Sequence, residues 1–529
     1  MLPNSINRRT FLSVASAAVC AASAKAGTTP IAKTNSGQVR GSTTDGVIAF
    51  KGIPFAGSLS GENRFKPAPK LTPWTGVRDA LVYGEQSIQP PDPGWPKSWK
   101  PAPASEDCLF LNVWTPGIGD AKKRPVMFYS HGGGFANGNG GAEVFPQNLG
   151  HDGSALAKNY DVVVVTHNHR LGILGSLYLG EILGEEYAAS GAAGMLDIVA
   201  ALEWVRDNIE AFGGDPGNVM IFGESGGASK TATLTALPAA QGMYHKASME
   251  SLPGLKLTTR DAGTELAKTV LAKLGVKKPK DLAKVSARRI QEVQKELAGT
   301  DPMFFQPVVD GHFIPTHPYD PVAPAMSAKI PMLIGTNKDE TVLFFRQGSE
   351  EVFSLDEEGM RNRLFPILRE RTKHVVDVYH HSRPNASPAD IYIAITTALF
   401  MWNVAITLAE RKVALNAAPI YMYLFAYESE VPVSAKTHYP MKAAHAMEVA
   451  FKFDHPDNNP DAGKKPERYK VASNMSAAWA AFARSTNPNH SGIPKWPAYT
   501  LDQRATMILD SECKVVNDPY KEERLVWLS

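Results

Sequence analysis

Gly223-Glu224-Ser225-Gly226-Gly227 is the stretch that decides the fold of this chain. It follows a short apolar run, residues 219–222, that predicts a buried strand, and it precedes a segment from Ala228 that predicts a helix. Glycines around a serine are typical of a tight strand-to-helix turn, because they accept strained backbone angles and a close approach of strand and helix. Such a turn holds the Ser225 hydroxyl beside a helix N-terminus, whose N–H groups stabilise negative charge. We therefore expect Ser225 to be an activated nucleophile.

A second glycine-rich segment supports this expectation. Residues 125–130 predict a strand, which runs directly into His131-Gly132-Gly133-Gly134-Phe135. Three consecutive glycines allow backbone N–H groups to converge on one point, as an oxyanion hole requires. We predict that the N–H groups of Gly133, Gly134 and Gly226 form this hole. A flexible glycine loop is the alternative.

Strands and helices alternate along the chain. Residues 161–166 form a β-branched run, residues 194–208 have apolar side chains at helical spacing, and residues 329–335 and 420–425 predict later strands. Alternation of this kind predicts an α/β protein with a mostly parallel, doubly wound central sheet and active groups at the carboxyl ends of the strands. We expect residues 27–529 to form a single catalytic domain.

The composition excludes several classes of protein. A hydrophobic fraction of 43% and a charged fraction of 20% over 529 residues predict a globular protein with ample core. The net charge of +2 gives no basic surface for a nucleic-acid partner. The chain has no Cys-x-x-Cys and no His-Glu-x-x-His stretch, so no metal site is predicted.

The first 26 residues resemble an export signal. Arg8 and Arg9 give a twin-arginine start, residues 13–19 are apolar but too short to span a bilayer, and Ala24-Lys25-Ala26 offers a cleavage site. Ala22-Ser23-Ala24 is an alternative cleavage site, and retention of the segment as an anchor is an alternative fate. No later apolar run approaches the ~20 residues of a transmembrane helix. We expect a periplasmic or secreted protein with no stable membrane anchor after signal removal.

The remaining cysteines are Cys108 and Cys513. In an exported protein they could form a disulfide, and two buried free thiols are the alternative. The sequence leaves both open.

The chain resembles the type-B carboxylesterases, the family that includes bacterial nitrobenzyl esterases and the cholinesterases. The resemblance extends from about residue 37 to about residue 500 and is carried by Gly37-Gln38-Val39-Arg40-Gly41, by residues 105–114 and by Asn487-Pro488-Asn489. It implies an α/β-hydrolase fold with helical insertions that cover an active-site gorge. It also implies ester hydrolysis without a metal or organic cofactor. Relatives commonly have alanine where this chain has Gly226, which we expect to keep the N–H donor but to loosen the turn.

The other members of a catalytic triad follow from the order serine, acid, histidine. Residues 335–340 resemble the acid loop of the family, which implies Glu340 as the acid, with Asp339 as the alternative. Residues 445–451 resemble its histidine motif, which implies His445 as the base, with His438 as the nearest alternative. His445 would then take the proton from Ser225 while Glu340 orients the imidazole.

The substrate pocket is predicted less directly. Met303 and Phe305 precede a region that borders the acyl pocket in the family, and we predict that they bind substrate. Packing in the core is the alternative. Lys230, on the helix after the nucleophile, is predicted to receive an acidic group of the substrate, and a solvated helix lysine is the alternative. This would make the protein an esterase selective for carboxylate-bearing esters.

Two functions from different classes result. The first is a secreted serine carboxylesterase that acts on small-molecule esters through an acyl-enzyme. The second is a catalytically silent binding or adhesion protein on the same fold. The complete set of Ser225, Glu340, His445 and the glycine loop favours the enzyme. The sequence specifies neither the ester nor the oligomeric state.

Overall fold

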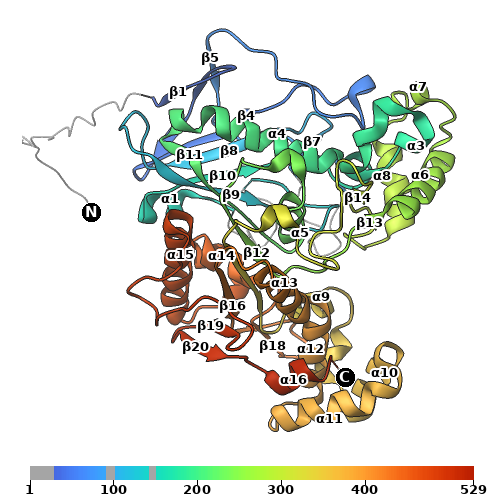
Figure 1. The fold of residues 1–529 in the computed structure, drawn as a ribbon, viewed down its shortest axis with the longest axis vertical. Coiled ribbons are helices and arrows are strands. Elements are labelled where there is room, and N and C mark those ends of the chain that lie inside the picture. The colour runs from blue at the N-terminus through green and yellow to red at the C-terminus, as the bar shows by residue number, and fades with distance from the viewer. Residues whose placement is uncertain (1–28, 91–101, 142–150, 529) are drawn as a thin grey trace, which may run out of the picture.

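The computed structural model describes residues 29–90, 102–141 and 151–528. The predicted export signal, residues 1–26, lies outside these ranges. Within them an eleven-stranded sheet crosses the molecule (Figure 1). Its strands, in spatial order, are β20 (Lys514–Asn517), β19 (Ala505–Leu509), β16 (Ile420–Phe425), β15 (Met332–Asn337), β12 (Lys246–Glu250), β11 (Gly214–Glu224), β9 (Arg124–Ser130), β10 (Val163–His167), β8 (Phe110–Thr115), β4 (Val47–Pro54) and β3 (Ser42–Thr44).

The central strands of the sheet are parallel. From β10 through β9, β11, β12, β15 and β16 to β19 every neighbouring pair runs in the same direction, and only the outer pairs are antiparallel. Met220 of β11, for example, lies beside Met127 of β9 and Lys246 of β12. The mostly parallel, doubly wound sheet is confirmed.

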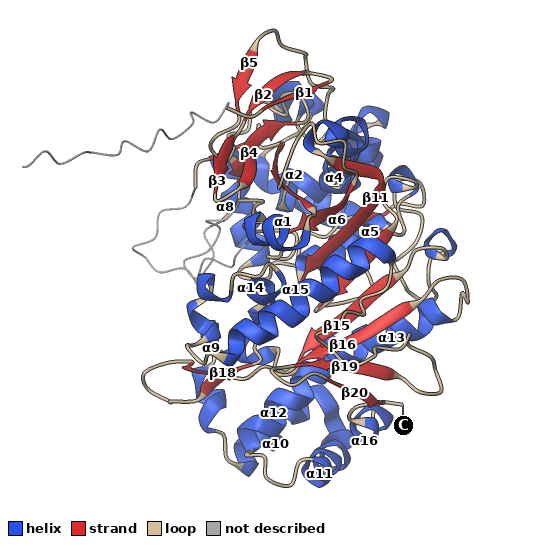
Figure 2. Cartoon of the chain, turned by 90° about the vertical axis from the view of Figure 1, so that its left-hand side faces the viewer, coloured by secondary structure: helices blue, strands red, loops and turns tan. Residues whose placement is uncertain are grey.

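Both faces of the sheet are buried. In β9, Val126 and Phe128 enter one hydrophobic cluster, whereas Met127 and Tyr129 enter another. Because successive side chains of a strand point to opposite faces, the two clusters lie on opposite sides of the sheet. Helices cover both, and Figure 2 shows them against the twisted strands. The first cluster includes residues of α4 (Ala193–Asn208), α5 (Gly226–Leu234) and α13 (Asn403–Val413), and the second includes residues of α1 (Ser154–Tyr160), α14 (Met447–Lys452) and α15 (Glu467–Ser485).

Two helical stretches, Glu185–Phe212 and Pro388–Val413, are long and apolar enough to cross a membrane by length and composition. No apolar stretch of this length was predicted after the predicted signal segment. Most of each stretch is buried inside the fold, as is typical of core helices, whose sides all face other parts of the protein.

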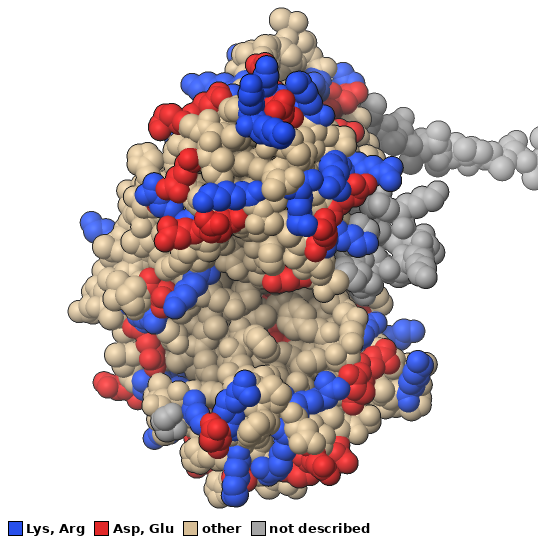
Figure 3. Space-filling model, turned by 90° about the vertical axis from the view of Figure 1, so that its right-hand side faces the viewer, with Lys and Arg blue, Asp and Glu red and all other residues tan. Residues whose placement is uncertain are grey.

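Two groups of helices project from the sheet. The upper group in Figure 1 packs around its own hydrophobic cluster, and the lower group follows β15. Between the groups, Figure 3 shows a hollow with a mostly uncharged surface. The upper group consists of α2 (Gly172–Ser176), α3 (Gly180–Leu183), α6 (Arg260–Leu274), α7 (Pro279–Leu282) and α8 (Ala287–Ala298), and the lower group of α9 (Thr341–Gly348), α10 (Glu357–Leu368), α11 (Thr372–Ser382) and α12 (Pro388–Thr397).

The remaining elements are short. A three-stranded sheet lies near the start of the described chain, and three two-stranded sheets lie outside the main sheet. Cys108, which is buried, and Cys513 are both free thiols. The short elements are β1 (Ile31–Thr34), β2 (Gly37–Arg40), β5 (Val77–Asp79), β6 (Gln86–Ser87), β7 (Ala104–Ser105), β13 (Thr258–Thr259), β14 (Val308–Val309), β17 (Ser429–Pro432), β18 (Pro440–Lys442) and α16 (Lys521–Leu525).

Candidate active site

Ser225 occupies the sharp turn between β11 and α5. Its backbone has φ 58° and ψ −120°, a conformation that side chains other than glycine rarely adopt. The N–H of Ser225 donates to the carbonyl of Glu250 at 2.8 Å, which fixes the turn against β12. A Cβ atom at Gly227 would lie 2.1 Å from the carbonyl oxygen of Ser130. The glycine is therefore required by the close approach of α5 to the end of β9, and the Ser225 side chain remains partly exposed.

The glycine loop lies directly against this turn. Gly133 and Gly134 have φ of 80° and 60°, and a Cβ atom at Gly226 would lie 2.4 Å from the nitrogen of Gly134. Within the described residues the N–H groups of Gly133 and Gly134 donate to no acceptor. The N–H of Gly226, the first residue of α5, has no acceptor within its helix. Glycine at 226 thus has a steric role, since it permits the loop and the helix to touch.

Glu340 and His445 form a short, buried pair. Glu340 Oε2 lies 2.6 Å from His445 Nδ1. Its other oxygen accepts hydrogen bonds from the Ser251 hydroxyl at 2.6 Å and from the Asn337 N–H at 2.7 Å. The alternative acid, Asp339, instead accepts from a backbone N–H at 3.3 Å. Every oxygen of Glu340 is therefore occupied, so the carboxylate holds the imidazole in one orientation.

The other nitrogen of His445 faces the turn that carries Ser225. Nε2 lies 3.1 Å from Oε1 of Glu224, the residue before the serine, without hydrogen-bond geometry. Within the described residues no hydrogen bond joins His445 to Ser225. Catalytic hydrogen bonds are often loose in enzymes without substrate. The arrangement therefore brings His445, the predicted base, close to the turn that carries Ser225, with Glu224 as an additional acidic neighbour.

The electrostatics of this group favour a protonated histidine. Burial alone lowers the pKa of His445, but the carboxylates of Glu224 and Glu340 offset this and raise it to about 9. Burial raises the pKa of Glu224 itself, against the opposing effects of His445 and Lys452. His445 and Glu224 consequently share charge at the site, each stabilising the ionised form of the other.

Comparisons with known proteins agree with this geometry. The model of the carboxylesterase family matches residues 28–527. The chain is 37% identical to para-nitrobenzyl esterase of Bacillus subtilis (strain 168), an alignment that covers 93% of this chain and 97% of that protein.

The chain belongs to the carboxylesterase family.

Other relatives and solved structures are similar over comparable lengths. Cocaine esterase of Oryctolagus cuniculus is 34% identical, over 90% of this chain and 91% of that protein. The crystal structure of carboxylesterase EST55 of Geobacillus stearothermophilus superposes with a TM-score of 0.80 at 35% identity, covering 94% of this chain and 99% of that one. The protein is accordingly a carboxylic-ester hydrolase of the α/β-hydrolase fold, and the alternative of a catalytically silent binding protein finds no support.

Met303 and Phe305, which were predicted to bind substrate, follow a residue that contacts the glycine loop of this carboxylesterase. The carbonyl of Pro302 accepts the N–H of Phe135 at 3.0 Å, so the segment that follows abuts the loop. Phe305 is buried in the hydrophobic cluster of the upper helical group, and Met303 is partly buried against the main core. Phe304, between them, is 37% exposed. The exposed aromatic surface of this segment thus belongs to Phe304.

Phe344 is a site residue that sequence reasoning missed. Its ring centroid lies 4.8 Å from that of His445, and 42% of the residue is exposed. It stands on α9, four residues after Glu340, so one helical turn separates the predicted acid from an aromatic ring beside the predicted base. This spacing places Phe344 near Glu340, but no sequence signal indicates its contact with His445.

Lys230 does not face the hollow. It is fully buried within α5, and its Nζ donates to the carbonyl of His131 at 2.9 Å. Burial lowers the pKa of Lys230 to about 7, against the opposing charge of Glu224. The Lys230 side chain therefore lies beneath the glycine loop, and a substrate carboxylate would have to displace its contact with the His131 carbonyl to reach it.

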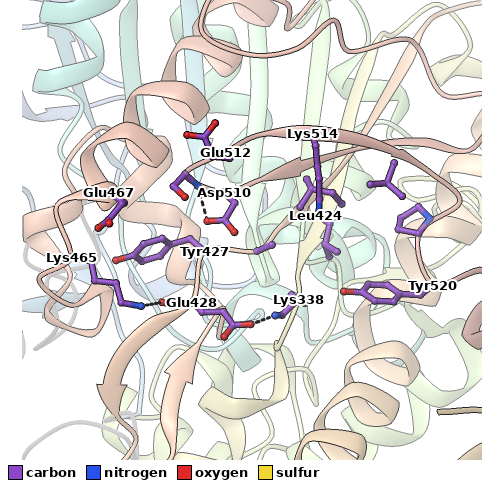
Figure 4. Close-up of a pocket in the computed structure, with 15 residues that line it drawn as sticks. Lys338, Leu424, Tyr427, Glu428, Lys465, Glu467, Asp510, Glu512, Lys514 and Tyr520 are labelled. Carbon is purple, nitrogen blue, oxygen red and sulfur yellow. Dashed lines mark hydrogen bonds and ion pairs between the residues drawn. The ribbon is translucent and has the colours of Figure 1, made fainter. Parts of the chain in front are cut away.

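A separate cleft of about 850 Å³ lies at the carboxyl ends of β15, β16 and β19 (Figure 4). Lys338 forms an ion pair with Glu428 there, and Lys465 donates to the carbonyl of Glu428. Asp510 and Lys514 add one charge of each sign. None of the described residues that line the cleft is a histidine. These residues therefore do not repeat the arrangement of Ser225 and His445.

Proposed function

We propose that this carboxylesterase hydrolyses uncharged carboxylic esters through an acyl-enzyme on Ser225. The observation that carries the proposal is the 2.6 Å contact of Glu340 with His445, whose free nitrogen faces the strained turn that holds Ser225. The N–H groups of Gly133 and Gly134, which donate to no acceptor among the described residues, support an oxyanion hole beside that turn, completed by Gly226.

The proposed reaction has two halves. Ser225 Oγ attacks the ester carbonyl carbon while His445 Nε2 takes its proton, and the carbonyl oxygen becomes an oxyanion held by the N–H groups. The bond to the alcohol then breaks, and His445 returns the proton to the leaving alkoxide. Water attacks the acyl-enzyme by the same route, which releases the acid and restores Ser225. Glu340 keeps the imidazole in the tautomer that accepts the proton at Nε2.

Apolar esters fit the surroundings of the site best. Phe304 and Phe344 expose aromatic surface near the oxyanion loop and near His445, and the hollow that Figure 3 shows is mostly uncharged. Selectivity for carboxylate-bearing esters is the weaker alternative, because it requires a cation that faces the substrate, and Lys230 is fully buried. Comparing rates on neutral and carboxylate-bearing esters for Lys230→Ala tests it: an acidic subsite requires a selective loss on the charged ester.

Labelling with an organophosphate tests the nucleophile. We expect one phosphoryl group per chain, loss of labelling and of ester hydrolysis in Ser225→Ala, and retention of both in Ser229→Ala. Ser229 is a matched control because its hydroxyl is buried on the same helix and has no hydrogen-bond partner in the described part of the chain. Labelling that persists in Ser225→Ala would reject the proposed mechanism.

We also propose that the protein is exported through its first 26 residues. The adjacent Arg8 and Arg9 before a short apolar run support a twin-arginine signal. Fractionation of bacteria that express the full chain tests this: the esterase is expected outside the cytoplasm, and Arg8→Lys with Arg9→Lys is expected to retain it inside. Equal distribution of the two chains would contradict export by this route.

A further inference from the structure

Lys230 is an unusual residue at its position. It is fully buried, and the carbonyl of His131 is its hydrogen-bond acceptor. Among the described residues no carboxylate lies within ion-pair distance of Nζ, although the charge of Glu224 acts on it from farther away. The ring of Phe135 has its centroid 6.0 Å from Nζ. Burying an amine costs stability unless it is hydrogen-bonded, so the bond to His131 is the main contact that holds Lys230.

The partner of Lys230 indicates that role. His131 is the first residue of the loop that carries Gly133 and Gly134, whereas Lys230 stands on α5, the helix whose first residue is Gly226. The hydrogen bond therefore joins the two segments that would supply the oxyanion hole. The segments also approach closely where Gly226 faces Gly134.

The far end of the loop is held in a matching way. The N–H of Phe135 donates to the carbonyl of Pro302 at 3.0 Å, and the carbonyl of Phe135 accepts from the N–H of Gly172 at 2.7 Å. Gly133 and Gly134 thus lie between His131, whose carbonyl accepts one hydrogen bond from Lys230, and Phe135, whose backbone makes two hydrogen bonds. Both glycines have positive φ and wide conformational freedom. The direction of their N–H groups therefore depends on the anchored ends and on the hydrogen bonds that the Gly133 carbonyl accepts from Ala136 and Asn137.

We propose that Lys230 is a positioning residue for the oxyanion hole, which ties the start of the glycine loop to the helix that carries the nucleophile. The proposal rests on the proposed function, since it assumes that the loop binds the oxyanion formed on Ser225. Lys230 would then not contact the substrate directly. It would act through its hydrogen bond to the carbonyl of His131.

The test compares Lys230→Met, which keeps the length of the side chain but removes its donors, with the control Ser229→Ala. A trifluoromethyl ketone, which Ser225 converts into a hemiketal oxyanion, reports on the hole, and the corresponding methyl ketone reports on ordinary binding. We expect Lys230→Met to lower kcat/KM about 10- to 100-fold, since loss of one whole donor costs more than this. Affinity for the trifluoromethyl ketone is expected to fall in proportion, with KM and methyl-ketone binding changed less than about twofold.

Lys230→Gln provides a second variant, because its amide retains N–H donors on a shorter side chain. We expect its kcat/KM to lie between those of wild type and Lys230→Met. If Lys230→Met does not fold, Lys230→Gln carries the same comparison of the two ketones. A variant whose kcat/KM and trifluoromethyl-ketone affinity both equal the wild-type values would overturn the proposal, as would equal losses for both ketones.

Organophosphate labelling separates this outcome from failure of the proposed function. If wild type is not labelled at Ser225, the proposed function itself fails. If wild type is labelled stoichiometrically and Lys230→Met hydrolyses esters at the wild-type rate, only the positioning role of Lys230 fails.

Discussion

The carboxylate of Glu224 lies 3.1 Å from Nε2 of His445, the nitrogen that the proposed mechanism uses as its base. The opposite nitrogen of the ring contacts Glu340. The imidazole thus stands between two acids, which together raise its pKa to about 9. Since the base must be neutral to accept a proton, activity should rise as the pH approaches this value.

Removal of the Glu224 charge is expected to move the acidic limb of the pH profile. Glu224→Gln eliminates one of the two negative charges that stabilise the imidazolium, so the pKa of His445 falls and more of the base is neutral at pH 7. The rising limb of kcat/KM against pH should shift to lower pH. Glu203→Gln, an exposed change on α4, serves as the control. A limb that stays at the wild-type pH would show that Glu224 does not set this pKa.

Gly226→Ala is expected to impair the oxyanion hole. The new Cβ atom would lie 2.2 Å from the oxygen and 2.4 Å from the nitrogen of Gly134, so the loop must move. We expect kcat/KM to fall about 10- to 100-fold, with weaker inhibition by a trifluoromethyl ketone. Gly254→Ala is the matched control, because a Cβ at that position meets no atom within 4 Å. Wild-type kinetics in Gly226→Ala would show that the loop adapts without cost.

The buried ion pair of Glu250 and Lys452 offers a test of stability. Both side chains are fully buried, and Glu250 also accepts hydrogen bonds from Ser248 and Trp479. Lys452→Met leaves the Glu250 carboxylate buried without its cation, which should cost about 3–5 kcal/mol. Adding Glu250→Gln removes the uncompensated charge. In thermal melts, the Tm of the double variant should therefore lie closer to that of wild type than the Tm of Lys452→Met does. Additive losses in the two variants would contradict this coupling.

The sequence specified the central sheet well because buried parallel strands carry continuous apolar runs. Residues 420–425 were predicted as a strand and form β16, and residues 125–130 lie within β9. The glycines of the turn and the loop could also be predicted from the sequence, because close approaches of the backbone leave no space for a Cβ atom there.

The environment of individual side chains was less predictable. Lys230 was interpreted as facing substrate or solvent, because a helical lysine is usually exposed, but α5 packs under the oxyanion loop and buries it. Phe344 was missed because its contact with His445 joins residues about 100 positions apart, and neither segment indicates the other. Sequence patterns predict elements, whereas these contacts depend on how the elements pack.

Phe344 gives the final prediction, which concerns substrate choice. Its exposed ring beside His445 provides apolar surface that a bulky ester would cover and a small ester would not. Loss of about 1.4 kcal/mol of apolar contact corresponds to a tenfold change in affinity, so Phe344→Ala should raise KM for benzyl hexanoate about tenfold. Rates on ethyl acetate should change little. Phe365→Ala removes an aromatic ring from a residue on α10 that is 51% exposed and serves as the control. Equal losses of activity on both esters would indicate instead that Phe344 positions His445, because a displaced base slows the hydrolysis of every substrate alike.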